Sequence, residues 1–351
     1  DYKVTGVQTC ALPISSTSSR PKNEQRRWLY PFLLAIVYIT WFSYMFLANR
    51  WSLFTEFWPV SLTMTLGSFV AGATAEGGAA VAFPVFTKAL HIPSGDARTF
   101  GLMIQSVGMT MAAVMIYSQR VKILPHIIGW VSLGGILGQT LGTYVFTIPA
   151  PYPKILFTFV TTAFGIALII SRWFTKWEPR RDLPAWDYRY KALFFVVGVF
   201  GGSFAAQTGS GIDTLTFIVL TLAFGINEKI STPTTVVIMA MNSIVGFFLH
   251  GVVSQDIGIA WNYWLVAVPI VVIGAPFGAY VASRVHRDSI IIFLLMLISL
   301  ELVTTLWLIP FSSLTQVLVT ATAVAVCAVL FWLMLSYRKK NVPMGEAFAT
   351  D

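Results

Sequence analysis

Gln207-Thr-Gly-Ser-Gly211 is a polar, glycine-rich stretch in the middle of the apolar segment 190–226. A stretch of similar character, Ala75-Glu-Gly-Gly-Ala79, lies within the apolar segment 57–91. Backbone groups cannot stay unpaired in lipid, so a non-helical break at membrane depth must be buried in protein or line a polar cavity. We therefore expect both breaks to lie inside a membrane protein and to be the leading candidates for its functional site.

The composition indicates that lipid is the solvent of this fold. The chain has 351 residues, of which 56% are hydrophobic and 11% charged, and its mean hydropathy is +0.74. These values lie outside the usual range of soluble domains. A helix needs about 20 apolar residues to cross a hydrocarbon core, and several runs approach or exceed this length: 28–48, 156–170, 260–282 and 317–335. We expect an all-α polytopic membrane protein.

The formal net charge of +8 does not indicate nucleic-acid binding, because Lys and Arg lie at the ends of apolar runs and form no continuous face. Cytoplasmic loops of membrane proteins carry an excess of these residues. We therefore predict a multi-pass protein of the bacterial inner (plasma) membrane, with both termini in the cytoplasm. Five basic clusters are predicted to face the cytoplasm as well: Arg20/Lys22/Arg26/Arg27, Arg120/Lys122, Arg172 through Lys191, Arg284/Arg287 and Arg338/Lys339/Lys340.

The charge pattern predicts that each broken segment is a hairpin of two shorter helices. If 57–91 crossed the membrane once, Arg120 and Lys122 would lie outside. A hairpin of about 57–74 and 79–91 returns them to the inside, and the same argument makes 190–226 a second hairpin.

The two hairpins belong to an internal repeat. Sliding the chain against itself aligns Gly77-Gly78 with Ser210-Gly211 and Thr99 with Thr232. The first copy begins outside and the second begins inside, which predicts inverted repeats of the kind found in secondary transporters.

Each copy also holds a Gly-x-x-x-Gly helix, at Gly138/Gly142 and Gly274/Gly278. We expect these helices to pack closely on another helix, with pairing to each other left open.

The repeat divides the chain into a core and its flanking segments. We expect residues 1–15 to be translated non-native sequence within a disordered basic leader. The predicted organisation is a leader at 1–27, a peripheral helix at 28–56, transporter repeat 1 at 57–173, a cytoplasmic linker at 174–189, transporter repeat 2 at 190–310, a C-terminal helix at 311–337 and a cytoplasmic tail at 338–351.

The breaks supply the candidate substrate site. A new helix begins after each break, and its free N–H groups and positive dipole end favour an anion. Glycines let a ligand approach the backbone, although they equally allow tight helix packing. The predicted substrate-binding residues are Glu76, Gly77, Gly78, Ala79, Arg98, Thr99, Gln105, Gln207, Thr208, Gly209, Ser210, Gly211, Thr232 and Asn242.

Two carboxylates beside the breaks, Glu76 and Asp213, are the candidate coupling residues, because an acid at membrane depth is costly. They would bind H+ or Na+, whereas the competing interpretation is that Asp213 caps the helix that follows it. Glu301 interrupts another apolar run and is expected to pair with a polar residue of another helix. The four histidines are dispersed, so no metal site or cofactor is predicted.

In the order of its duplicated motifs the chain resembles the TauE/SafE family of sulfite exporters and related sulfonate permeases. The resemblance covers about residues 57–310 and implies a transporter of sulfite, sulfonates or similar organosulfur anions, driven by an ion gradient or the membrane potential. Departures occur at the glycine clusters and at Pro84, whose counterpart is Phe217. The resemblance rests on Gly72-Ala-Thr-Ala-Glu-Gly-Gly78, Pro84, Ala97-Arg-Thr99, Gly198 through Gly211, Ser231-Thr232 and the two Gly-x-x-x-Gly-x-Tyr-Val elements.

The residues alone indicate an anion-biased, inverted-repeat transporter. A cation-coupled carrier of another small anion is the alternative within the same class. An intramembrane enzyme is disfavoured, since the chain has no His-Glu-x-x-His motif and no paired aspartates. A structural membrane protein would have little need for two polar breaks at depth. The expected partners are a small anion, a coupling ion and the lipid bilayer, with a homodimer left open.

Overall fold

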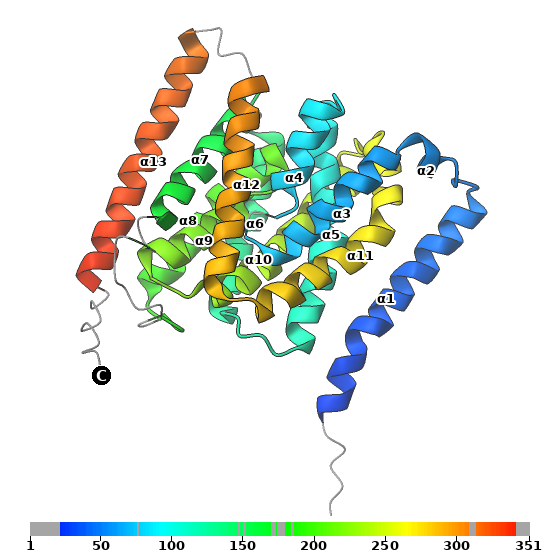
Figure 1. Cartoon of the computed structure of the whole chain (residues 1–351), viewed down its shortest axis with the longest axis horizontal. Coiled ribbons are helices and arrows are strands. Elements are labelled where there is room, and N and C mark those ends of the chain that lie inside the picture. Colours follow the sequence, from blue (N-terminus) through cyan, green and yellow to red (C-terminus); the bar gives the residue numbers. More distant parts are fainter. Residues whose placement is uncertain are drawn as a thin grey trace, which may run out of the picture.

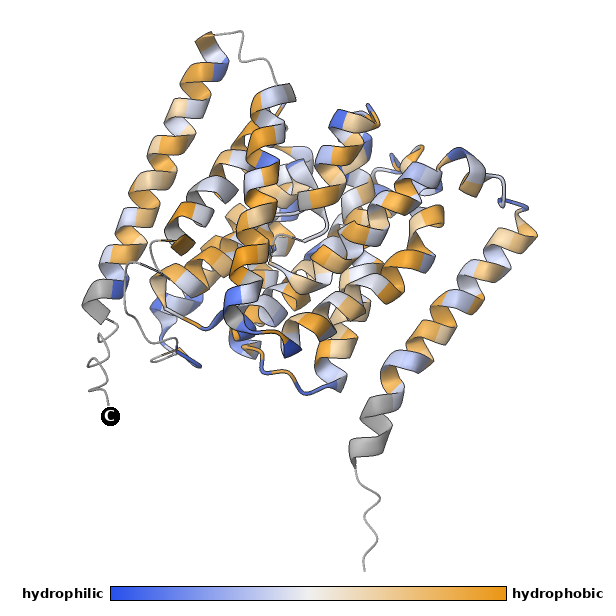
Figure 2. Ribbon diagram, in the orientation of Figure 1, coloured by the Kyte–Doolittle hydropathy of each residue, from blue (hydrophilic) through white to orange (hydrophobic). Residues whose placement is uncertain are grey.

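The computed structural model describes residues 22–75, 77–146, 148–149, 152–169, 173, 180–183, 186–308 and 314–341. In this part of the chain the regular structure is helical, apart from an isolated β-bridge between Arg180 and Ile226. Six of the described helices are long and apolar enough to cross a membrane, and apolar residues run along them (Figure 2). The prediction of an all-α polytopic membrane protein is thereby confirmed, whereas the predictions for residues 1–15 and for Glu76 lie outside the described residues.

The helices form a central bundle flanked on opposite sides by α1 (Lys22–Leu47) and α13 (Leu314–Asn341), as Figure 1 shows. α1 begins within the stretch expected to be a leader. The bundle holds two broken hairpins, described below, and eight further elements: α2 (Leu53–Glu56), α5 (Ser94–Ser118), α6 (Pro125–Tyr144), α7 (Tyr152–Ile169), α10 (Glu228–Phe248), the π-helical turn η4 (Leu249–Val253), α11 (Ala260–Arg284) and α12 (Arg287–Leu308).

The first hairpin consists of α3 (Trp58–Ala73), α4 (Ala79–Pro84) and the π-helical turn η1 (Val85–Ala89). α3 ends because Thr74 adopts an extended backbone, with φ −132° and ψ 166°. Gly77 follows with φ +66°, a left-handed conformation that favours glycine. The chain therefore leaves the helix at the predicted break and starts a new helix just beyond it.

Aromatic contacts show that this first segment turns back on itself. The rings of Phe57, before α3, and of Phe86, in η1, both pack on Tyr263, with ring centroids 5.1 and 6.3 Å away. The two ends of the hairpin thus lie together near the start of α11, and the break lies at its turn.

The second hairpin has the same plan. It consists of α8 (Tyr188–Thr208), α9 (Ile212–Ile218) and the π-helical turn η3 (Val219–Ala223), and its break contains Gly209 at φ +81° and Gly211 at φ +136°. Its two ends also meet, because the rings of Phe194 in α8 and Phe224 after η3 stack with centroids 5.6 Å apart.

The two hairpins open toward opposite faces of the bundle. The first opens at the start of α11, beside Tyr263. The second is followed directly by α10, whose Lys229 lines one cavity together with Arg284 from the end of α11. We call the face that carries Lys229 and Arg284 the basic face. This geometry agrees with inverted repeats, although the equivalence of the two halves as wholes stays a prediction.

Small residues bring each hairpin close to a helix of the other half. α6 packs on α8, where a Cβ on Gly138 would collide with the backbone of Val199. α11 packs on α3, where a Cβ on Gly278 would collide with the backbone of Phe69. The two Gly-x-x-x-Gly helices therefore pack closely on another helix, as expected from the small side chains. Their principal partners are the first helices of the hairpins and not each other.

A missing helical hydrogen bond in α11 is replaced from α1. Pro269 has no N–H, so the carbonyl of Leu265, four residues earlier, lacks its usual donor. Trp41 of α1 donates its indole N–H to the Leu265 oxygen at 2.8 Å, and the hydroxyl of Tyr38 donates to the Pro269 oxygen at 2.6 Å. α1 is therefore attached to the core by polar side-chain contacts as well as by packing.

Candidate functional site

The two breaks meet at Gly77. A Cβ on Gly77 would lie 2.8 Å from Ser210 Oγ and 2.9 Å from both Asp213 Oδ2 and Gln105 Oε1. These three oxygens come from the second break, from α9 and from α5. Since any side chain would strike them, glycine is required here for space as well as for its backbone angle. The structure thus brings four of the predicted residues into one polar cluster, which we call the break centre (Gly77, Gln105, Ser210 and Asp213).

A direct hydrogen bond also joins the breaks. The hydroxyl of Thr214, in α9, donates to the carbonyl of Ala75 in the first break at 3.1 Å. Both residues are buried. The bond satisfies a buried carbonyl of the non-helical break. The two halves are therefore held in one relative position by a directional hydrogen bond as well as by close packing.

Asp213 caps its own helix. Its Oδ1 accepts hydrogen bonds from the backbone N–H groups of Gly211 and Thr214, both at 3.0 Å, and its side chain is fully buried. These amides lie at the start of the second helix, where an anion was expected to bind. With Asp213 in place they are occupied, so the competing interpretation of this residue as a cap describes its present contacts. A coupling role for Asp213 stays a prediction.

Gln105 contacts the second break from α5. Its Nε2 donates to the carbonyls of Gly209 at 2.7 Å and Gly101 at 3.2 Å. Gly101 itself lies against Gly209, because a Cβ on Gly101 would be 3.4 Å from the Gly209 Cα. The amide oxygen of Gln105 is buried and has no hydrogen-bond partner. Of the predicted residues, Gln105 is thus the one that carries an unsatisfied acceptor at the break centre.

Other predicted residues lie around the break centre in different roles. The amide of Gln207 donates to the carbonyls of Gly142 and Phe146, so its side chain fastens the end of α6. The hydroxyl of Thr208 donates to the carbonyl of Phe204 at 3.1 Å. Asn242 donates from Nδ2 to Gln139 Oε1 at 3.0 Å and belongs to the contact between α6 and α10.

Five further predicted positions are Glu76, Gly78, Ala79, Arg98 and Thr99, and Thr232 is described with the cavities below. The backbone of Arg98 lies against Gly209, and its Nε is buried without a hydrogen-bond partner. Thr99 is buried in the first turns of α5. Gly78 lies in the helical region just before α4, which begins at Ala79. Glu76 is outside the described residues.

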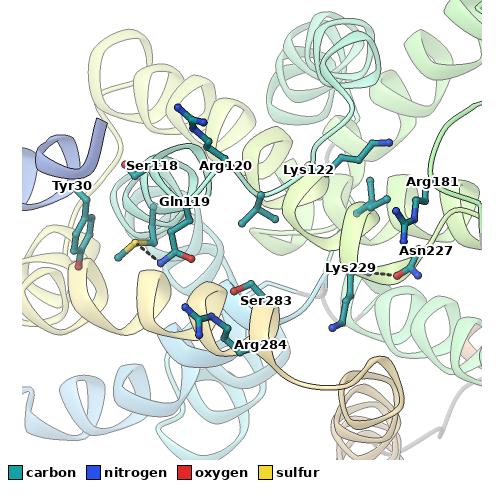
Figure 3. A pocket seen from close by; sticks show the side chains of 13 residues that line it. Tyr30, Ser118, Gln119, Arg120, Lys122, Arg181, Asn227, Lys229, Ser283 and Arg284 are labelled. Carbon is teal, nitrogen blue, oxygen red and sulfur yellow. Dashed lines mark hydrogen bonds between the residues drawn. The ribbon is translucent and has the colours of Figure 1, made fainter. Parts of the chain in front are cut away.

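A wide basic cavity opens on the same face as the second hairpin. Its volume is about 910 Å³, and we call it the vestibule. Figure 3 shows its side chains, which come from the end of α5 and the turn after it, Arg181, the start of α10 with Asn227 before it, the end of α11, and Tyr30 of α1. Among the described residues that line it there is no carboxylate, and five side chains are positively charged: Arg120, Lys122, Arg181, Lys229 and Arg284.

The vestibule continues into a narrow neck. This second cavity has a volume of about 20 Å³ and shares Val121, Lys229 and Ser283 with the vestibule. It reaches Gly72, in the last turn of α3, and Thr232, whose hydroxyl is buried without a hydrogen-bond partner. A volume of this size holds about one water molecule. The neck is therefore the constriction between the vestibule and the region of the first break.

The sequence analysis did not include Lys229 among the site residues, although its spacing from Thr232 indicates that the two lie together. From sequence it is one basic residue at a helix start, and such residues are common on the cytoplasmic side of membrane proteins. It lies three residues before Thr232, which is nearly one helical turn, so both residues share a face of α10. The spacing alone could have connected Lys229 with the predicted Thr232.

A second buried polar cluster ties the first hairpin to the outer helices. Lys88 Nζ, in η1, lies 3.6 Å from Glu301 Oε1 of α12, and both side chains are 4% exposed. Lys88 also donates to the hydroxyls of Thr304 and Thr305, at 2.8 and 3.0 Å, and Glu301 accepts from Thr158 of α7 at 2.9 Å. The expectation that Glu301 pairs with a polar residue of another helix is confirmed.

The second hairpin is fastened in a comparable way. Arg338 of α13 is buried and donates from Nη1 to the carbonyl of Thr221, in η3, at 2.9 Å. The returning arm of each hairpin thus ends in a π-helical turn that a cationic side chain links to another helix, α12 for the first hairpin and α13 for the second. Within the described residues no group of three or more His, Cys, Asp or Glu side chains is placed to hold a metal ion.

Comparison with known proteins gives the family of the chain. The family model described as Sulfite exporter TauE/SafE matches residues 60–304, which include both hairpins, the neck and the break centre. Comparison with curated proteins and with solved structures gives no match. Since the family match covers most of the chain, and since this family consists of transporters and not of enzymes, the protein is a multi-pass membrane transporter that belongs to the TauE/SafE sulfite exporter family.

Proposed function

We propose that the protein moves a small sulfur-containing anion, such as sulfite, a sulfonate or another organosulfur anion, across the bacterial inner membrane by alternating access. The observation that carries this proposal is the basic vestibule, which narrows at Lys229 to a neck that reaches Gly72 and Thr232, close to the first break. In this proposal the basic face is the cytoplasmic face, in agreement with the excess of Lys and Arg on it.

The charge of the vestibule selects for anions. Among its described lining residues five are cationic and none is anionic, and Lys122 forms an ion pair with the exposed Asp182. A unit charge 4 Å from one cation gains about 4 kcal/mol at the effective dielectric constant of a protein surface. Clefts of one sign raise the association rate of oppositely charged ligands by about 10 to 10³. A cationic substrate would be repelled by the same side chains.

The neck supplies donors that suit an oxyanion. A sulfite or sulfonate group presents several acceptor oxygens and needs hydrogen-bond donors once it has left water. Lys229 offers an ammonium group, and Thr232 and Ser283 offer hydroxyls. The hydroxyl of Thr232 is buried and has no hydrogen-bond partner, so it can donate to an arriving oxyanion. The anion would reach the break centre by passing between these side chains.

The arrangement of the hairpins suits alternating access. They open toward opposite faces, meet at the break centre and pack on α6 and α11 through small residues, which let the helix backbones approach closely. The π-helical turns η1 and η3, which are attached to outer helices, keep the far ends of the hairpins in place. Movement would then be concentrated at the breaks and at the neck.

A second candidate function is a carrier of another small anion that is coupled to a cation. Asp213 is a fully buried carboxylate at membrane depth, which favours coupling to H+ or Na+. Glu76 would take part as the second predicted coupling residue. A cation-coupled carrier of another small anion would share this feature, so the identity of the anion has to be tested separately from the coupling ion.

Transport by the purified protein in liposomes tests this proposal. Counterflow of ³⁵S-labelled sulfite would be measured against unlabelled sulfite, a sulfonate, sulfate and acetate inside the vesicles, with protein-free liposomes as the control. We expect exchange with the sulfur anions and little exchange with acetate. Exchange that acetate supports as well as sulfite, or the absence of any protein-dependent sulfite exchange, would contradict the proposed substrate class.

A further inference from the structure

The orientation of the Gln105 side-chain amide is fixed by its surroundings. Its Nε2 donates to two backbone carbonyls, of Gly209 and Gly101. The reversed orientation would place Oε1 against both of these carbonyl oxygens, which is unfavourable because carbonyls only accept hydrogen bonds. Oε1 must therefore point toward Gly77, where it is buried and has no donor.

The group that Gln105 faces is also an acceptor. Oε1 of Gln105 and Oδ2 of Asp213 each lie 2.9 Å from the position of a Cβ on Gly77. Both oxygens therefore lie on the same side of Gly77, and an acceptor without a donor is costly inside a membrane protein unless a cation or a proton comes to lie between the two. Asp213 Oδ1 accepts from the amides of Gly211 and Thr214, whereas Oδ2, on the side of Gly77, has the hydroxyl of Ser210 at 3.4 Å, which is long for a hydrogen bond between two oxygens. Ser210 Oγ, 2.8 Å from the same position, completes a set of oxygen ligands.

We propose that Gln105 Oε1, Asp213 Oδ2 and Ser210 Oγ together hold one small monovalent cation, H+ or Na+, and that this is the coupling site of the transporter. The inference rests on the proposed transport function and adds Gln105, a neutral residue, to the coupling machinery. Oxygen-only ligands suit a hard cation, and a proton on Oδ2 would give Gln105 the donor that it lacks.

The other charged groups of the surrounding helices lie at helix ends. Arg189 and Lys191 stand in the first turn of α8, and Glu228 and Lys229 in the first turn of α10. On α5 the charged residues Asp96 and Arg98 are in the first two turns, and Gln105 follows about two turns beyond Arg98. Glu76 adjoins Gly77 in sequence and is the other carboxylate that the sequence analysis predicts to take part in coupling.

A cation at this position would connect substrate binding with the conformation of the hairpins. Its ligands come from α5, from the second break and from α9, and they enclose the space beside Gly77 of the first break. The cation would thus stabilise the state in which both breaks are in contact. It would also neutralise Asp213, which otherwise repels an anion arriving at the break centre. Cation and anion binding are then expected to favour each other, and the effect must be reciprocal.

The test measures cation binding without substrate, so it does not depend on the identity of the anion. Thermal unfolding of the purified protein in detergent would be followed while NaCl replaces choline chloride at constant ionic strength and pH. A parallel titration of pH would be made in choline chloride alone. Since a ligand that binds only the folded state stabilises it by mass action, a Na+ site raises the unfolding temperature in the first titration and a proton site changes it in the second.

Three variants and one control decide the outcome. We expect Gln105→Leu and Asp213→Asn to weaken the cation effect at least tenfold, whereas Gln139→Leu, which alters a buried glutamine in the contact between α6 and α10, should retain it. If Gln105→Leu does not fold, Ser210→Ala is informative, because it removes the third oxygen ligand and leaves the hydrogen bonds of Gln105 Nε2 in place. Wild-type cation dependence in Gln105→Leu, or in Ser210→Ala where Gln105→Leu does not fold, would overturn the proposal. Loss of sulfite exchange with an intact cation effect would instead count against the proposed substrate.

Discussion

The hydroxyl of Tyr30, in α1, donates a hydrogen bond at 3.1 Å to the carbonyl of Val272, in α11. That carbonyl lacks its helical donor, because the residue four positions later is Pro276. The relationship repeats the one between Trp41 and Leu265, and Tyr30 also lines the vestibule. α1 is therefore peripheral in position but supplies hydrogen bonds that α11 cannot make by itself.

Removing such a donor is expected to destabilise the protein modestly. Trp41→Phe leaves the Leu265 carbonyl unpaired and should cost about 1 kcal/mol, a typical value for one hydrogen bond. Thermal unfolding in detergent measures the change, with Phe46→Leu on the exposed side of α1 as the control. In the background of Pro269→Ala, which returns a helical donor to Leu265, the cost of Trp41→Phe should shrink. An equal cost in both backgrounds would contradict the explanation from the missing donor.

Gly77→Ala is expected to abolish transport while the protein still inserts in the membrane. Alanine in the left-handed conformation costs roughly 1–2 kcal/mol, and its Cβ would strike the three oxygens of the break centre. Gly95→Ala is the matched control, because Gly95 has open space around its Cβ position. Expression and anion exchange would be measured for both variants. Normal exchange by Gly77→Ala would show that the breaks need not approach this closely.

Lys229→Gln is expected to slow anion transport by about tenfold, which corresponds to about 1.4 kcal/mol. The charge of Lys229 stands where the vestibule narrows to the neck. Lys122→Gln is the control, because Lys122 lines the vestibule but is exposed and paired with Asp182. Initial rates in liposomes at low and high salt provide the measurement. If the two variants are equally active, the neck does not attract the anion through Lys229.

The ion pair of Lys88 and Glu301 predicts strong coupling between two substitutions. Lys88→Met alone leaves a buried carboxylate without its cation and is expected to cost about 3–5 kcal/mol. Adding Glu301→Gln removes the uncompensated charge and should recover much of the loss. Unfolding of the single and double variants measures the coupling energy. Strictly additive effects would mean that the two charges do not stabilise each other.

The orientation in the membrane can be tested by cysteine labelling. If the basic face is cytoplasmic, Arg181→Cys should be protected from an impermeant thiol reagent in intact cells, and Gln255→Cys, in the turn between η4 and α11, should be labelled. Both variants would be made in a background without the chain's two cysteines, Cys10→Ala with Cys327→Ala. Ready labelling of position 181 from outside would reverse the proposed direction of the vestibule.

The helical breaks were predictable because a glycine cluster within an apolar segment interrupts a helix, and in lipid such an interruption must be buried in protein. The pairing of Glu301 was predictable in kind, since a buried carboxylate needs a partner, but Lys88 lies too far away in sequence to be identified. The capping role of Asp213 was one of two roles that its position allowed, because the first turn of a helix is where a carboxylate can reach free amides. The role of Gln207 was not predictable, since it depends on how α8 lies against the end of α6.

The neck also determines where the membrane voltage acts on a moving charge. A vestibule of about 910 Å³ that is filled with water has the electrical potential of the face to which it opens, whereas a neck of about 20 Å³ interrupts this conducting path. The potential difference across the membrane therefore falls mainly beyond Lys229. One elementary charge crossing 100 mV exchanges about 2.3 kcal/mol with the field. Most of this electrical work would then be done between Lys229 and the opposite face, on a path that begins where the anion passes Gly72 and Thr232.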